Sequence, residues 1–107
     1  MWSVNMQHFL DENGSTDQIP VKAKELADHF GAIVAVVTLD FTGRTIVVSG
    51  ITCRNPKSPG CSGSIIGCLG RDIESIEWYC TDCEDSGVIT GWDGTLWDCK
   101  EEALAGL

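Results

Sequence analysis

The sequence predicts an α+β fold, in which one N-terminal helix packs against a small antiparallel β half. Three observations support this prediction: a helical apolar pattern around residue 30, short β-branched runs after residue 44, and cysteines confined to the second half. With 107 residues, the chain can bury one hydrophobic core but not two. We therefore predict a single domain, 1–107, made of the segments 1–19, 20–44, 45–99 and 100–107.

The first segment, 1–19, is expected to be irregular, with a short strand at 2–6 and a polar turn at Asn13-Gly14. Pro20 suits the first turn of a helix, where its missing N–H costs nothing. Apolar residues then recur at spacings of four, three and four, at Leu26, Phe30, Ile33 and Val37. This spacing places them on one face of a helix.

Gly31 leaves two interpretations of the helical segment open. It lies either inside one helix of about 17 residues or after a helix that ends at Phe30, with 32–38 as a buried strand. We favour one continuous helix, because the residues of 32–38 alternate poorly between polar and apolar.

The β half, 45–99, contains short runs of β-branched and aromatic residues separated by turn residues. These runs predict strands at 45–49, 64–69, 75–79 and 87–92. Turns or loops are expected at 39–44, 56–60 and 93–94, and a frayed helical turn at 100–107.

The charge and hydropathy of the chain disfavour several classes of partner. Seven basic and 16 acidic residues give a net charge of −9, which opposes non-specific binding to nucleic acids and to anionic membranes. The longest apolar stretch, 32–37, is too short to cross a bilayer. The N-terminal residues lack the pattern of an export signal, so we expect a cytoplasmic protein with reduced thiols.

The six cysteines carry the strongest chemical signal: Cys53, Cys61, Cys68, Cys80, Cys83 and Cys99. Cys80-x2-Cys83 follows a Cys53-x7-Cys61 pair after 18 residues, a separation typical of zinc ribbons. Four thiolates suit one tetrahedral structural zinc ion, and we predict Cys53, Cys61, Cys80 and Cys83 as its ligands. Cys68 and Cys99 are interpreted as small buried side chains, with Cys99 the first replacement if one ligand is wrong.

We expect no enzymatic activity and predict a zinc-binding module for an unidentified protein partner. Two alternative functions are a nucleic-acid-binding zinc ribbon and a thiol oxidoreductase that uses Cys80 and Cys83. Two alternative states of the cysteines are an iron site and an oxidised scaffold with three disulfides. His8 and His29 lack the spacing of metal ligands. The cluster of Trp78, Trp92 and Trp97 has two interpretations, an aromatic binding platform and a filled core, and we favour the filled core.

The C-terminal half resembles a family of small uncharacterised bacterial proteins with a zinc-ribbon-like segment. The matching features are Trp78-x-Cys80-x2-Cys83, Gly87-x-Ile89, Trp92, Thr95-x-Trp97-Asp98, Cys53-Arg54 and Cys61-Ser62-Gly63, with a similar stretch at 26–34. The resemblance covers most of 26–98 and implies that the four predicted ligands are equivalent positions, while Cys68 and Cys99 are additional. Two features depart from this family. Glu84 follows Cys83 at a position where such proteins usually have glycine, and the loop after Cys53, often strongly basic in such proteins, has only Arg54 and Lys57 as basic residues.

Overall fold

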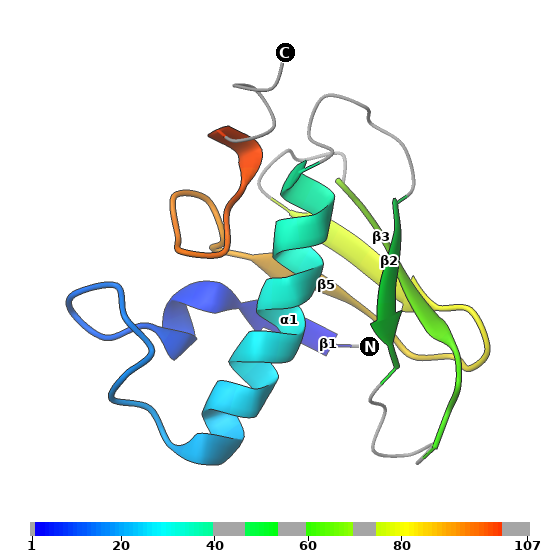
Figure 1. The fold of residues 1–107 in the computed structure, drawn as a ribbon, viewed down its shortest axis with the longest axis horizontal. Coiled ribbons are helices and arrows are strands. Elements are labelled where there is room, and N and C mark those ends of the chain that lie inside the picture. The colour runs from blue at the N-terminus through cyan, green and yellow to red at the C-terminus, as the bar shows by residue number, and fades with distance from the viewer. Residues whose placement is uncertain (1, 40–46, 54–59, 70–74, 102–107) are drawn as a thin grey trace.

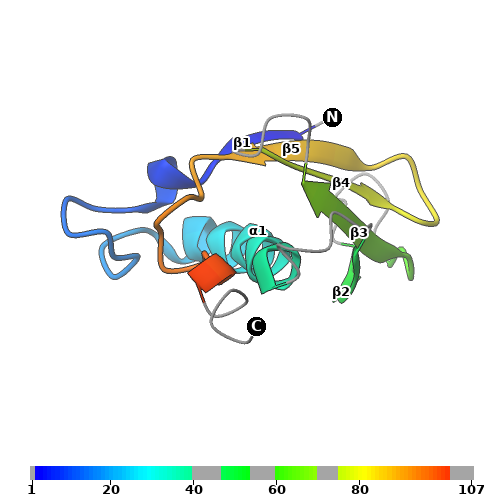
Figure 2. The same ribbon diagram turned by 90° about the horizontal axis from the view of Figure 1, so that it is seen from above.

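The computed structural model describes residues 2–39, 47–53, 60–69 and 75–101, and it has an α+β fold (Figure 1). One long helix lies against one face of a five-stranded sheet, so the molecule has two layers (Figure 2). The elements are β1 Trp2–Asn5, the 3-10 helix η1 Met6–Phe9, α1 Val21–Leu39, β2 Val47–Thr52, β3 Ser64–Leu69, β4 Ile76–Cys80 and β5 Ser86–Thr90. The predicted fold class is confirmed.

The sheet has the strand order β1-β5-β4-β3-β2. Strands β2 to β5 are antiparallel neighbours, as predicted, whereas β1 runs parallel to β5 and makes the whole sheet mixed. A short strand at 2–6 was expected, but its pairing with β5 was not. This pairing places Val4 opposite Ile89, which is distant in the sequence. The side-chain amide of Gln7 donates to the Gly91 carbonyl at 2.7 Å and extends this connection beyond β1.

Helix α1 is continuous from Val21 to Leu39, so the preferred interpretation of Gly31 as an interior helical residue is confirmed. Phe30, Ile33 and Val37 are buried on the face that contacts the sheet. Leu26 was expected on the same buried face, and that expectation is wrong, since the side chain is 42% exposed. Leu26 instead borders a cavity between the N-terminal half of α1 and the sheet.

The tryptophans predicted around the second cysteine pair form part of the core. Trp78, Trp92 and Trp97 are exposed by only 2%, 1% and 8%. Strand β4 alternates as predicted, with Ile76 and Trp78 buried and Tyr79 exposed. The filled-core interpretation of these three residues is therefore confirmed.

The strand boundaries differ from the predicted ones by small amounts. Strand β3 has the predicted limits, and β4 and β5 begin and end within two residues of theirs. Strand β2 is described from Val47 and extends beyond its predicted end to Thr52, while residues 45–46 of the prediction lie outside the described residues. Of the predicted turn at 39–44, only Leu39 is among the described residues. Residues 54–59 of the loop between Cys53 and Cys61 and residues 102–107 of the tail also lie outside the described residues. Among the described residues, no helix combines the length and the apolar character that crossing a membrane requires.

Thr38 connects the end of α1 to the segment that follows Trp97. Its side chain is fully buried, donates to the Val34 carbonyl at 2.7 Å and accepts the Cys99 N–H at 2.9 Å. Thr38→Val would leave that N–H without its acceptor, so we expect a loss of about 1.5 kcal/mol in unfolding free energy. Urea denaturation measures the loss, and Thr38→Ser, which keeps the hydroxyl, should recover most of it. Equal stabilities of the valine variant and the unmodified protein would contradict the prediction.

Candidate metal centre

The candidate metal centre lies where two connections between strands meet at one end of the sheet. Cys53 follows β2 and Cys61 precedes β3, while Cys80 ends β4 and Cys83 lies in the turn to β5. Because β2 to β5 are antiparallel neighbours, the β2–β3 and β4–β5 connections lie at the same end of the sheet. This is the arrangement of two neighbouring hairpin loops that a zinc ribbon requires.

Backbone hydrogen bonds hold the two connections in place. The Cys53 N–H donates to the Gly63 carbonyl at 3.0 Å, and the Cys80 N–H donates to the Asp85 carbonyl at 2.9 Å. Between the two connections, the Thr81 N–H donates to the Ser64 carbonyl at 3.1 Å. The sheet and these backbone hydrogen bonds together bring the cysteines of the two connections close to one another.

The four sulfur atoms form a compact group. All four Sγ atoms lie within 4.8 Å of one another. The Cys53 and Cys83 sulfurs are 3.7 Å apart, and those of Cys61 and Cys80 are 3.6 Å apart. A regular tetrahedron with Zn–S bonds of ~2.3 Å has edges of ~3.8 Å, whereas a disulfide bond measures only ~2.05 Å. The sulfurs thus have the spacing of a tetrahedral metal site, and none of the six cysteines forms a disulfide bond.

Each connection directs one backbone N–H at a sulfur two residues earlier. Gly63 N–H donates to Cys61 Sγ and Asp82 N–H donates to Cys80 Sγ, both at 3.4 Å. Such donors stabilise a thiolate, because they place partial positive charge beside it. Cys61 and Cys80 thus make the same local contact, although Cys61 lies at the end of its loop and Cys80 at the start of its loop.

The pKa values of these two thiols respond differently to their surroundings. Burial raises the pKa of Cys80, but the N–H groups of Asp82 and Cys83 outweigh it and lower the pKa to about 7. The Gly63 N–H lowers the pKa of Cys61, but burial and the neighbouring thiols outweigh it, and the net shift is upward. Cys80 therefore offers a thiolate to a metal ion near neutral pH.

The structure brings together all four predicted ligands and leaves the other two cysteines apart. Cys68 lies on β3 opposite Glu77 of β4, and burial together with that carboxylate raises the pKa of its thiol. Cys99 lies near the end of α1, where its N–H contacts Thr38, so it does not replace a predicted ligand. Within the described segments, the four cysteines are the one group of three or more side chains suited to a metal.

Glu84 occupies the position at which the family resemblance led us to expect glycine. The loop nevertheless closes: the Cys80–Asp85 backbone bond spans it, and the Asp82 N–H contacts the Cys80 sulfur. His8 lies exposed in η1 and His29 lies on α1, and neither belongs to the sulfur group. The basic residues Arg54, Lys57 and Arg71, which are close to the cysteines in the sequence, lie outside the described residues.

Comparisons with models of protein families, with curated proteins and with solved structures found no match to this chain. The resemblance to the small bacterial family with a zinc-ribbon-like segment therefore stays a prediction. The geometry of the four sulfurs is the basis for assigning a function.

Gly63 is packed directly against the sulfur group. A Cβ atom at this position would collide with Cys80 Sγ and lie only 3.1 Å from the Asp82 nitrogen. Gly63→Ala should therefore displace the Cys80 sulfur and weaken zinc binding by ~10–100-fold, the usual cost of disturbing the residues that orient metal ligands. Competition with a chromophoric chelator measures this, and Ser62→Ala, at an exposed neighbouring site, is the matched control. Equal zinc affinities of the two variants would contradict the prediction.

Proposed function

We propose that the chain binds one structural zinc ion through Cys53, Cys61, Cys80 and Cys83. The observation that carries this proposal is the spacing of the four sulfurs, which lie within 4.8 Å of one another. Four thiolates complete the tetrahedron that zinc prefers, so no coordination position remains for a substrate or an activated water. The ion would therefore stabilise the fold and not act in catalysis.

Zinc is the proposed metal because structural sites of four thiolates most often hold it, although iron has a similar preference for sulfur. A zinc ion would join the β2–β3 connection to the β4–β5 connection across one end of the sheet. A domain of this size has a limited hydrophobic core, and such a cross-link adds stability that the core alone does not supply.

For the role of the folded module, we propose binding to a protein partner. The net charge of −9 supports this choice over nucleic acid, since phosphate backbones select basic surfaces. The acidic residues Asp82 and Glu84 are exposed beside the metal centre itself. We expect no salt-sensitive retention on heparin or on oligonucleotides at low ionic strength, and clear retention would favour the nucleic-acid alternative.

Elemental analysis and thiol counting test the zinc proposal directly. We expect one zinc ion per chain in protein purified under reducing conditions without chelators. Cys68 and Cys99 should react with a thiol reagent in the holoprotein, and the four ligands only after the metal is released. Full reactivity of all six thiols without bound metal, or three disulfides, would overturn the proposal. Bound iron would replace the structural role with electron transfer.

The test also separates a structural metal site from a dithiol enzyme. In such enzymes the reactive Cys-x2-Cys motif lies at a helix N-terminus, where the dipole stabilises the thiolate. Here Cys80 ends strand β4 and Cys83 lies in the turn before β5. We therefore expect no reduction of insulin disulfides by the zinc-free protein. Catalysis that disappears in Cys83→Ser would favour the oxidoreductase alternative.

A further inference from the structure

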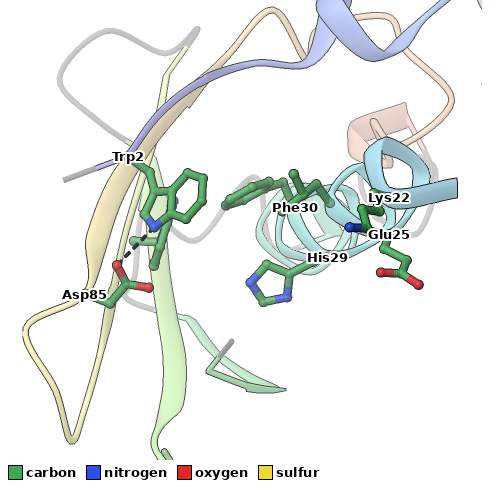
Figure 3. Close-up of a pocket in the computed structure, with 8 residues that line it drawn as sticks. Trp2, Lys22, Glu25, His29, Phe30 and Asp85 are labelled. Atoms are coloured by element: carbon green, nitrogen blue, oxygen red, sulfur yellow. Dashed lines mark hydrogen bonds between the residues drawn. The ribbon is translucent and has the colours of Figure 1, made fainter. Parts of the chain in front are cut away.

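A second candidate site lies away from the sulfur group, between the N-terminal half of α1 and the sheet. It is a cavity of ≈160 Å³. Its eight lining residues include three Trp or Phe side chains from different elements, Trp2 of β1, Phe30 of α1 and Trp78 of β4. Figure 3 shows the Phe30 ring extending from the helix toward Trp2, with His29 beside it. Leu26, at the border of this cavity, is 42% exposed.

Trp2 is the most accessible of the three rings, since it is half-buried, whereas Phe30 and Trp78 are each only 2% exposed. The Trp2 and Phe30 centroids are 5.5 Å apart with the planes tilted by 58°, and those of Phe30 and Trp78 are 5.9 Å apart with a tilt of 47°. The negative faces of aromatic rings attract a cation placed within ~6 Å.

Carboxylates lie on both sides of the same cavity. Asp85 comes from the turn before β5, and one of its oxygens accepts the Trp2 indole N–H at 3.0 Å, which holds this carboxylate beside the ring (Figure 3). Glu25 comes from α1, and Lys22, one turn earlier, is the one lysine or arginine among the lining residues. Two acidic groups against one lysine, in a chain of net charge −9, favour a positively charged ligand.

We propose that this cavity binds a quaternary or trimethylated ammonium group. Such a group spreads its charge over methyl groups, so it satisfies the aromatic walls and the carboxylates at the same time. The cavity volume of ≈160 Å³ suits a ligand of this kind, since cavities of ~150 Å³ hold molecules as large as benzene. An anion would meet two carboxylates, and a neutral molecule would make no use of them.

Choline and its neutral carbon analogue, 3,3-dimethyl-1-butanol, test the proposal on the full-length, metal-loaded protein. Both have the same shape, but only choline is charged. Tryptophan fluorescence and the Trp2 indole N–H signal in NMR spectra report occupancy of the cavity. We expect saturable binding of choline, at least ~5-fold tighter than binding of the alcohol. Equal affinities would show a merely hydrophobic cavity, and no saturation by ~50 mM choline would exclude the site; either result overturns the proposal.

Variants on the surface of α1 separate a local effect from general electrostatics. Glu25→Gln should weaken choline binding by ~3-fold or more, while Lys22→Gln should strengthen it, because the lysine repels a bound cation. Asp28→Asn is the matched control: it removes one negative charge from an exposed position of the same helix that does not line the cavity. We expect it to leave the affinity unchanged. Equal losses in the Glu25 and Asp28 variants would contradict a specific site.

Discussion

Replacing Cys80 by serine should abolish zinc binding and lower the thermal unfolding midpoint by at least ~12 °C. The Cys80 sulfur lies 3.6 Å from that of Cys61 in the other strand connection, and Cys80 is only 5% exposed. Structural zinc contributes about 10–16 kcal/mol of binding free energy in small zinc-binding peptides, which matches or exceeds the total stability of most domains. Metal analysis and thermal denaturation followed by circular dichroism measure both expected effects.

Cys68→Ser is the matched control for this experiment. It makes the same chemical change in a half-buried cysteine of strand β3 that lies outside the sulfur group. We expect full zinc content and a midpoint within a few degrees of the unmodified protein. If Cys68→Ser lost the metal and Cys80→Ser kept it, the assignment of the ligands would be wrong. If both variants had the same unfolding midpoint as the unmodified protein, zinc would have no structural role.

Gly31→Ala should destabilise the protein by about 3 kcal/mol, although alanine is the better helix former by about 1 kcal/mol. Gly31 is buried in α1, and a Cβ atom there would collide with the indole ring of Trp97. That ring is itself 8% exposed and enclosed by the core, so it cannot move aside without disturbing its neighbours. Chemical denaturation measures the loss.

A double-mutant cycle shows whether the loss arises from the predicted contact. Trp97→Leu removes the indole and creates space above Gly31, so Gly31→Ala should cost much less in that background. The coupling energy should be at least about 1 kcal/mol. A stabilising effect of Gly31→Ala in the unmodified protein would mean that helix propensity outweighs the contact, and the prediction would fail.

The sequence predicted the features that depend on local spacing. The recurrence of Phe30, Ile33 and Val37 predicted the buried face of α1, since helical periodicity is short in range. Alternation in β4 predicted that Trp78 is buried and Tyr79 exposed. The separation between the two cysteine pairs predicted a four-sulfur group, and the structure brings those four sulfurs together.

The features that the sequence did not predict come from residues that are far apart in the chain. The parallel pairing of β1 with β5 joins Val4 to Ile89, and no local pattern encodes that choice of partner. The aromatic cavity has the same origin, because Trp2, Phe30 and Trp78 meet only in the folded chain. Leu26 borders this cavity and is exposed, which helical periodicity alone could not predict.

The parallel edge strand has a consequence for the order in which the protein assembles. Val4 and Thr90, joined by a hydrogen bond, are 86 positions apart, whereas the outermost cysteines of the metal centre are separated by 30. Closing the longer loop costs about 1 kcal/mol more in chain entropy. We therefore expect the metal centre to close early and β1 to join afterwards. During synthesis, β1 would then leave the ribosome before β2 to β5 but reach its place in this sheet after them.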